Sequence, residues 1–165
     1  MNQVNKTMYI PLYGKALVSR KGVILSDKKA EEIWENEKFP IRGKAKSKYL
    51  AYYMAMRARV FDEWTKEKLG EIPDAVVLHI GCGMDSRVLR VGTCANVWYD
   101  VDFEDVIEER KKHYSEASTY FMLSGDARET DWLMKTPENK PAIVIMEGIS
   151  MYLTPDENRQ LIQNL

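Results

Sequence analysis

Residues 75–86 read AVVLHIGCGMDS, an apolar run that ends in a pair of glycines. The run over 75–80 has the length of a strand and no polar alternation, so it predicts a strand that is buried on both faces of a parallel sheet. Gly81 and Gly83 favour a tight turn into a helix, where the backbone can approach a ligand closely. A turn without any ligand is the alternative, because glycine often only marks turns.

Downstream of this turn, short apolar runs alternate with helix-like segments. Three further strands are predicted, over 97–101, 119–123 and 142–146. A helix is predicted from Phe103 to His113, and Thr154 is expected to cap a last helix that begins with proline and acidic residues. Strands and helices that alternate at this spacing form βαβ units, so the sequence predicts a doubly wound α/β fold.

The residues before the glycine turn are predicted to be helical. Asp27 is expected to cap one helix, and a longer helix is predicted over 47–69 and ends at Gly70. The buried face of the longer helix is expected to contain the apolar residues Leu50, Tyr53, Met54, Phe61 and Trp64. The chain therefore divides into a helical region, 1–70, and a strand-containing region, 75–165.

Acidic residues follow three of the predicted strands: Asp102, Asp126 and Glu147. Ligands of doubly wound sheets bind outside the carboxyl ends of the strands, so these positions are candidates for binding. Asp102 lies 21 residues after Gly81, a spacing typical of an acid that binds ribose hydroxyls. Its alternative role is a helix cap, and the alternative for Asp126 is a polar turn. A nucleoside with hydroxyls and an amine would satisfy these acids, whereas they would repel phosphates.

Arg57 interrupts the apolar face predicted for the helix over 47–69. A charge at a buried position needs a partner, so Arg57 forms either an internal salt bridge with a strand-end acid or a clamp for a ligand carboxylate. Neither histidine is expected to be catalytic, because His79 lies inside a strand as a core residue and His113 lies at an exposed helix end. No catalytic residue is assigned.

Composition excludes several classes of function. The 165 residues suffice for one domain, and the net charge of -1 provides no positive field for nucleic acid or an anionic membrane. No signal-peptide pattern or membrane-length apolar run is visible, so a cytoplasmic protein is expected. Cys82 and Cys94 lack the spacing of a zinc site, so both are expected to be free thiols and no metal is expected.

Four segments, in order, resemble the motifs of the leucine carboxyl methyltransferases and the related polyketide O-methyltransferases of the tetracenomycin type. They are the glycine motif over 77–87, Trp98–Phe103, Asp126–Leu133 and Glu147–Leu153. The resemblance extends to 11–16 and 57–62. It implies a Rossmann-like class I methyltransferase that takes its methyl group from S-adenosyl-L-methionine, with residues 1–70 as a helical cap that helps to close the cofactor site.

The resemblance also implies which residues bind the amino-acid portion of the cofactor. Arg57, together with Lys15, would hold the methionine carboxylate. Gly81 and Gly83 would line this portion, and Glu147 would lie near the methionine amine.

A second set of residues is implied for the nucleoside. Asp102, with Phe103 beside it, would bind the ribose hydroxyls, and Asp126 and the backbone of Ala127 would meet the adenine. Family members more often have leucine at position 127, so Ala127 would leave a looser adenine pocket.

The implied activity is O-methyl transfer to a carboxylate or phenolic oxygen of a small molecule. Only four strands are predicted, fewer than a class I methyltransferase sheet contains, so a gene product truncated after the fourth strand is expected. Copies of the chain would then self-associate through an unpaired sheet edge. Two alternatives stay open: a module that binds the cofactor without turnover, and a nicotinamide-dependent oxidoreductase. Ser86, where a dinucleotide-binding motif has its third glycine, argues against the oxidoreductase.

Overall fold

The computed structural model describes residues 5–37, 39, 43–92 and 96–165, and the chain divides into two compact units. The helical unit comprises Met1–Lys66 and Gly83–Gly92, and the sheet unit comprises Glu67–Cys82 and Thr93–Leu165. The role of residues 1–70 as a cap over the cofactor stays a prediction. Cys94, which is expected to be a free thiol, lies outside the described residues.

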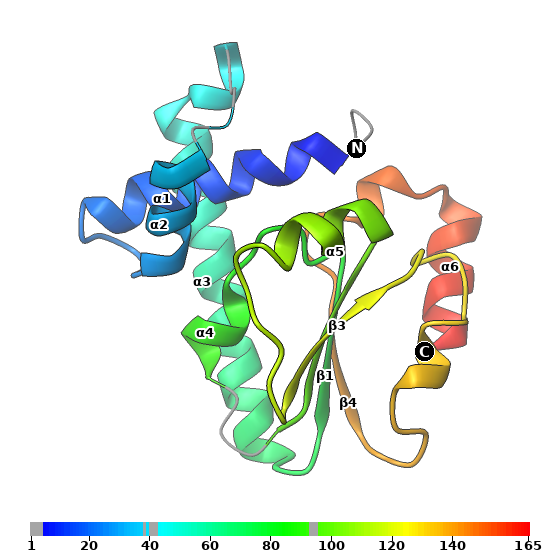
Figure 1. Ribbon diagram of the computed structural model, residues 1–165. Helices are drawn as coiled ribbons and strands as arrows, with labels where there is room; N and C mark the ends of the chain where they lie inside the picture. Colours follow the sequence, from blue (N-terminus) through cyan, green and yellow to red (C-terminus); the bar gives the residue numbers. More distant parts are fainter. Residues whose placement is uncertain (1–4, 38, 40–42, 93–95) are drawn as a thin grey trace. The chain divides into compact units, whose positions relative to one another are not determined.

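Parallel strands in the order β3-β2-β1-β4 form the centre of the sheet unit (Figure 1). They are β1 (Val76–Ile80), β2 (Trp98–Asp102), β3 (Tyr120–Ser124) and β4 (Ala142–Ile145). Each strand lies within one residue of its predicted range, so the α/β prediction is confirmed. Because the strands are parallel, their carboxyl ends meet at the same end of the sheet. In the described part of the chain β3 and β4 are the edge strands, and self-association through an edge stays a prediction.

Apolar side chains from the strands form the core of the sheet unit. All five residues of β1 are buried, as expected for a central strand that is covered on both faces. The rings of Tyr99 on β2 and Phe121 on β3 stack with their centroids 5.4 Å apart. The buried core cluster consists of Val76, Leu78, Ile80, Tyr99, Val101, Trp132 and Leu161. The strand residues that the sequence identifies as apolar therefore build the platform whose carboxyl end carries the candidate site.

Two helices of the sheet unit are α5 (Glu104–Arg110) and α6 (Pro155–Asn164), and short 3-10 turns span Leu133–Lys135 and Ser150–Tyr152. Thr154 caps α6 as predicted, because its hydroxyl accepts a hydrogen bond from the Glu157 N–H group. The Glu157 carboxylate in turn accepts one from the Thr154 N–H group.

The region around α5 corrects two predictions. The N-cap residue of α5 is Phe103 and not Asp102, so the cap role considered for Asp102 is wrong. The His113 side chain is 9% exposed, so its predicted exposure is also wrong. The helix ends at Arg110, and a turn follows in which the Tyr114 N–H group donates to the Arg110 carbonyl.

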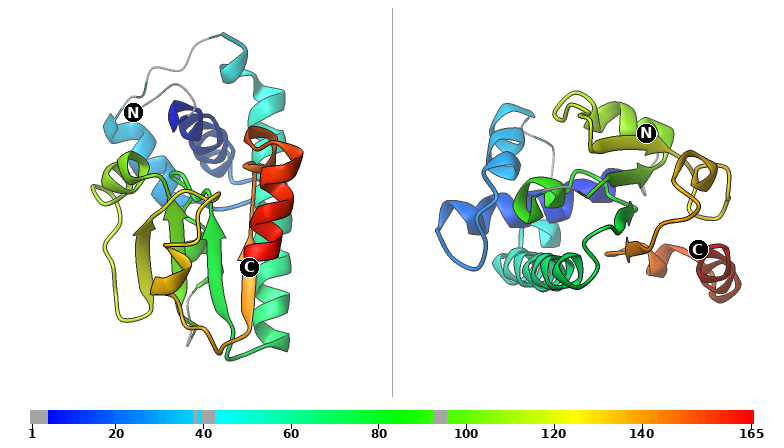
Figure 2. Two further views of the ribbon diagram at one scale, coloured as in Figure 1. Left: turned by 90° about the vertical axis from the view of Figure 1, so that its right-hand side faces the viewer. Right: turned by 90° about the horizontal axis from the view of Figure 1, so that it is seen from below.

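The helical unit contains α1 (Tyr9–Arg20), α2 (Lys28–Glu37), most of α3 (Lys48–Glu71) and the short α4 (Arg87–Val91), with 3-10 turns over Asn5–Met8 and Gly43–Lys46. α1 and α2 pack side by side (Figure 2). Asp27 caps α2 as predicted, since its Oδ1 accepts a hydrogen bond from the Ala30 N–H group at 2.9 Å.

The buried face of α3 differs from the predicted face. The buried positions are Ala51, Ala55, Ala58, Asp62 and Thr65. Tyr53 and Trp64 of the predicted face are 54% and 41% exposed, and its other members are half-buried. A Cβ added to Gly14 of α1 would lie 3.1 Å from the Ala51 Cα atom, so the two helix backbones approach closely. This close approach selects small residues for the interface and moves the large apolar side chains to its borders.

α3 also extends beyond its predicted end. The helix continues through Gly70 to Glu71, and the Ile72 N–H group still bonds to the Lys68 carbonyl at 2.9 Å. A glycine is tolerated in a last turn whose hydrogen bonds are formed, and Pro73 follows at once. Among the described helices, α3 included, none has both the length and the apolar composition needed to cross a membrane.

Candidate functional site

Gly81 follows β1 directly and adopts a backbone conformation that other residues avoid. Its φ angle is +69°, and its N–H group donates to the Val101 carbonyl of β2 at 2.8 Å. A Cβ atom at this position would lie 1.9 Å from Cγ2 of Ile149, in the segment after β4. Gly81 therefore has a structural reason to be glycine, since the chain segments after β1 and β4 approach each other here.

Asp102 is the last residue of β2 and is half-buried. Its Oδ1 accepts a hydrogen bond from the Phe103 N–H group at 2.8 Å, and its main-chain carbonyl accepts one from the Gly125 N–H group after β3 at 2.9 Å. The Phe103 side chain is 38% exposed. The ends of β2 and β3 are thus tied together through backbone, with a carboxylate and an aromatic ring beside the link.

The turn after β3 presents Asp126 near the surface. Its carboxylate accepts hydrogen bonds from both the main chain and the guanidinium of Arg128, at 3.0 and 2.9 Å. The bond from the Arg128 side chain holds the pKa of Asp126 below its ordinary value. This geometry supports the turn considered from the sequence. Ala127 packs against the core cluster, and a Cβ on Gly125 would lie 2.7 Å from the Cβ atom of Trp132. The turn is therefore closely packed against the core of the sheet unit.

Glu147 completes this set after β4. The residue is half-buried, and Gly148 after it has a φ angle of +79°. The sheet unit therefore brings six predicted site residues to the carboxyl ends of its strands: Gly81, Asp102, Phe103, Asp126, Ala127 and Glu147. Acidic side chains and a glycine turn at this end provide hydrogen-bond acceptors for hydroxyl and amino groups.

The other predicted site residues, Lys15, Arg57 and Gly83, belong to the helical unit. Lys15 is buried, and its Nζ lies 2.9 Å from Oδ1 of Asp85. Gly83 has a φ angle of +51°, and a Cβ there would lie 3.1 Å from the Cβ atom of Met8. Both positions are closely packed in the structure, and Lys15 has an acidic partner that the sequence did not suggest.

Arg57 lies at the border of the buried face of α3 and not within it. It is half-buried, and its guanidinium carbon lies 5.9 Å from the centre of the Tyr53 ring. The prediction that Arg57 faces the core is wrong, because the alanines of α3 occupy the interface with α1.

A network of buried charges in the helical unit was missed from the sequence. Arg90 of α4 donates to Oδ2 of Asp27 at 2.6 Å, to Oδ2 of Asp62 at 2.6 Å and to Oδ1 of Asp85 at 2.8 Å. Arg87 pairs with Asp62 at 2.8 Å and with Asp85 at 3.3 Å. Burial alone would lower the pKa of Arg90, but Asp85 and the other carboxylates raise it well above its ordinary value.

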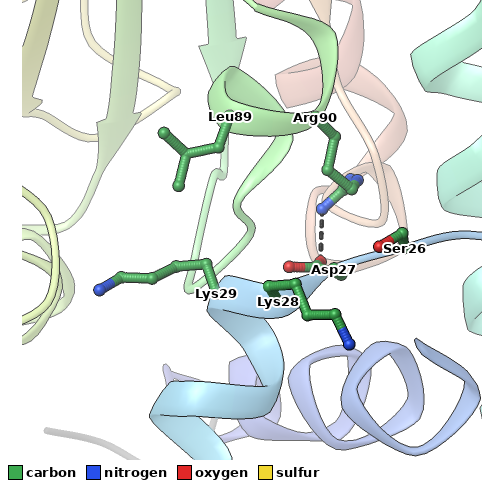
Figure 3. Close-up of a pocket in the computed structure, with 6 residues that line it drawn as sticks. All are labelled: Ser26, Asp27, Lys28, Lys29, Leu89 and Arg90. Atoms are coloured by element: carbon green, nitrogen blue, oxygen red, sulfur yellow. Dashed lines mark hydrogen bonds and ion pairs between the residues drawn. The ribbon is translucent and has the colours of Figure 1, made fainter. Parts of the chain in front are cut away.

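Arg90 and Asp27 also face each other at the wall of a pocket (Figure 3). The pocket has a volume of about 240 Å³ and is lined by Ser26, Asp27, Lys28, Lys29, Leu89 and Arg90. None of the predicted site residues lines it. A sequence signal for the network did exist, since Arg87 and Arg90 occupy a short helix among the apolar residues Val88, Leu89 and Val91.

The sheet unit has its own buried charged cluster around Asp100. The Asp100 carboxylate is bonded to Arg110, and it accepts hydrogen bonds from Trp98 at 3.0 Å and Tyr120 at 2.7 Å and lies 2.8 Å from Nδ1 of His79. Burial raises the pKa of Asp100, but the Arg110 charge and the His79 bond outweigh it and lower the pKa to about 2. His79 is thus a core histidine, as predicted, and Asp100 is engaged inside the unit, which leaves Asp102 as the acid at the strand end.

The described residues contain no cluster of three histidine, cysteine, aspartate or glutamate side chains that could hold a metal ion. The predicted site residues fall into two groups, one in each unit: the sheet unit has acids and a glycine at its strand ends, and the helical unit has two cations and a glycine.

Comparisons with known proteins give the site a context. The chain is 36% identical to the tetracenomycin polyketide synthesis O-methyltransferase TcmP of Streptomyces glaucescens over 98% of its length, and spans 61% of that protein. It is 33% identical to the S-adenosyl-L-methionine-dependent methyltransferase dpfgK of Gibberella zeae over 72% of its length, and spans 43% of it. The chain thus spans less than two thirds of either relative.

One solved structure and one family model also match the chain. The crystal structure of a protein from Thermobifida fusca YX that is described as a methyltransferase shares the fold, with a TM-score of 0.54 and 16% identity over 83% of this chain and 53% of that one. The model of the leucine carboxyl methyltransferase family matches residues 5–165. The match covers nearly every residue, including all the candidate site residues, and the chain belongs to the leucine carboxyl methyltransferase family.

Proposed function

We propose that this chain binds S-adenosyl-L-methionine and transfers its methyl group to a carboxylate or phenolic oxygen of a small molecule. The observation that carries the proposal is the row of Gly81, Asp102, Asp126 and Glu147 at the carboxyl ends of four parallel strands. Ligands of such sheets bind at this end, and acids there suit a nucleoside and disfavour a pyrophosphate. The family and the names of the two relatives support the same cofactor and reaction.

Each end of the cofactor has residues of suitable chemistry. Asp102 accepts hydrogen bonds from the ribose hydroxyls, with Phe103 beside it, and Asp126 and the backbone of Ala127 meet the adenine. Glu147 faces the methionine amine, and the backbone of Gly81 lines the amino-acid portion. Lys15, Arg57 and Gly83 of the helical unit hold the amino-acid portion, and the two cations match the charge of its carboxylate.

The chemistry of the transfer needs little from the protein. The bound sulfonium supplies an activated methyl group, so the residues of the chain have to align the acceptor oxygen and exclude water. A carboxylate acceptor is ionised at neutral pH and needs no general base, whereas a phenol does. No residue is assigned as that base.

The proposal is tested by calorimetric titration with S-adenosylhomocysteine, the product form of the cofactor. Asp102→Asn keeps the size of the side chain and removes its charge, and we expect the Kd to rise about 10-fold or more, the scale of a lost charge-assisted hydrogen bond. The control is Glu104→Gln, an exposed acid two residues away that removes the same charge and should leave the Kd within about twofold.

Two outcomes would overturn the binding proposal: wild-type protein that binds NAD and not S-adenosylhomocysteine, or an Asp102→Asn variant that binds as tightly as wild type. Turnover is tested with methyl-labelled cofactor and a panel of small carboxylic acids and phenols. Label in a methyl ester or methyl ether supports the transfer, and tight binding with no label in any acceptor identifies a binding module instead.

A further inference from the structure

Arg90 connects three segments of the helical unit that are far apart in sequence. Its guanidinium bonds to Asp27 at the start of α2, to Asp62 on α3 and to Asp85 in the loop after the glycine pair. The Ser86 hydroxyl adds a further link, since it donates to Asp27 and accepts a bond from Arg90 at 2.9 Å. The Arg90 side chain is 7% exposed, so these bonds form away from water and are correspondingly strong.

Asp85 relays this arrangement to Lys15. Oδ1 of Asp85 lies 2.8 Å from Nη1 of Arg90 and 2.9 Å from Nζ of Lys15, so one carboxylate oxygen holds both cations. The charges of the network balance, because Lys15, Arg87 and Arg90 face Asp27, Asp62 and Asp85. A lysine side chain has several rotatable bonds, and an ammonium fixed by one carboxylate takes its position from that carboxylate. The place of the Lys15 ammonium is therefore set by a chain of contacts that ends at Arg90.

We propose that Arg90 is a positioning residue for the amino-acid end of the cofactor, because it fixes Asp85 and, through Asp85, the Lys15 ammonium that receives the carboxylate. This inference rests on the proposed function. It goes further because it assigns a role in binding to Arg90 of α4 and to the acids at the start of α2 and on α3. This role affects only the amino-acid portion of the ligand. The nucleoside portion is assigned to residues of the sheet unit.

A substitution that keeps the charge isolates the geometric role. Arg90→Lys leaves the network neutral, but a lysine lacks the planar fork that reaches three carboxylates at once. Asp85 then keeps its contacts with Lys15 and Arg87 but loses the shorter bond from Arg90. The matched control is Arg59→Lys, the same change at a residue of α3 whose side chain is 55% exposed and pairs with Glu63.

The experiment compares two ligands that differ in the amino-acid portion. S-adenosylhomocysteine carries the carboxylate, and 5′-methylthioadenosine has the same nucleoside without it. For Arg90→Lys we expect the Kd of S-adenosylhomocysteine to rise about 5- to 20-fold, in the range of a weakened charged contact, and that of 5′-methylthioadenosine to stay within about twofold. Arg59→Lys should change neither Kd. A purely structural role for Arg90 would weaken both ligands equally, so equal weakening overturns the inference.

A second variant covers the case in which Arg90→Lys does not fold. Ser86→Ala removes the hydroxyl link between Asp27 and Arg90 without any change of charge, and it should shift the same ligand ratio in the same direction by a smaller factor. An unchanged ratio in a folded variant overturns the inference while the proposed function stands. Wild-type protein that binds neither ligand overturns both, and wild type that binds the two ligands equally overturns the role of Lys15 and with it that of Arg90.

Discussion

The sheet unit places a single buried acid, Asp100, against Arg110, His79, Tyr120 and Trp98, whereas the helical unit distributes its buried charge over three acids and three cations. Asp100 and Arg110 are both fully buried and form an ion pair. In the helical unit every acid touches at least one cation besides Arg90 or a further hydrogen-bond donor.

This difference shows two ways of keeping charge away from water. The concentrated pair depends on both partners, because the loss of the Arg110 guanidinium leaves a fully buried carboxylate without its permanently charged partner. A distributed network tolerates the loss of one member, because each remaining group keeps part of its coordination. The Asp100 cluster connects side chains of the neighbouring strands β1, β2 and β3. The helical network connects the start of α2, α3 and α4, which are far apart in the sequence.

The largest expected effect comes from removing one cation from each cluster. Arg110→Met leaves Asp100 without its cation, and we expect the free energy of unfolding to fall by about 3–5 kcal/mol. Arg90→Met should cost about 1.5–3 kcal/mol, because Asp62 keeps Arg87 and Asp85 keeps Lys15. Urea unfolding followed by circular dichroism measures both values. Arg159→Met removes an exposed arginine of α6 as control and should change stability by less than about 0.5 kcal/mol. Equal losses for Arg110→Met and Arg90→Met would erase the distinction between the clusters.

An intermediate effect is expected from acid. The pKa of Asp100 is lowered from 3.8 to about 2, so its stabilisation is complete above pH 4 and is lost as the pH falls through 3.8 towards 2. The difference in pKa corresponds to about 2 kcal/mol. The free energy of unfolding, measured at intervals between about pH 5 and about pH 2, should therefore fall more steeply for wild type than for Asp100→Asn. The Asp156→Asn variant, at an exposed acid, should follow wild type. Parallel curves for all three proteins would show that Asp100 is not the group that titrates.

The smallest expected effect on stability comes from an exposed ion pair, that of Asp126 with Arg128. Asp126 pairs with Arg128, whose side chain is 46% exposed, so Asp126→Asn should cost less than about 0.5 kcal/mol. Under the proposed function it should nevertheless raise the Kd of S-adenosylhomocysteine about 3-fold or more, through a lost bond to the adenine amine. Glu129→Gln, an exposed neighbour, is the control for both measurements. A stability loss as large as that of Arg110→Met would show that Asp126 belongs to a structural cluster and not to a ligand site.

The sheet and its strand-end residues follow from the sequence because their signals are local. Apolar runs of strand length and the glycines after β1 determine buried strands and a tight turn, whatever the rest of the chain does. The parallel arrangement then brings Asp102, Asp126 and Glu147 to one end of the sheet, as predicted. The cap of α6 is equally local, since Thr154 and Glu157 bond within one turn.

The face of α3 shows where local signals fail. Hydrophobic periodicity predicts that the buried face of this helix contains Phe61 and Trp64, but the buried face contains small residues instead. The choice depends on how closely α1 approaches, and Gly14 permits an approach that only small residues such as Ala51 can match. The same choice moves Arg57 from the core to its border.

The strands, the glycine turn and the acids at the strand ends can be read from the sequence alone, because each depends on residues that are neighbours along the chain. The partners of the buried charges, such as Lys15 with Asp85 or Arg90 with Asp27 and Asp62, become visible only in the folded protein. These partners come from different helices, and which charges meet is fixed by how those helices pack, a property that no local pattern of residues encodes.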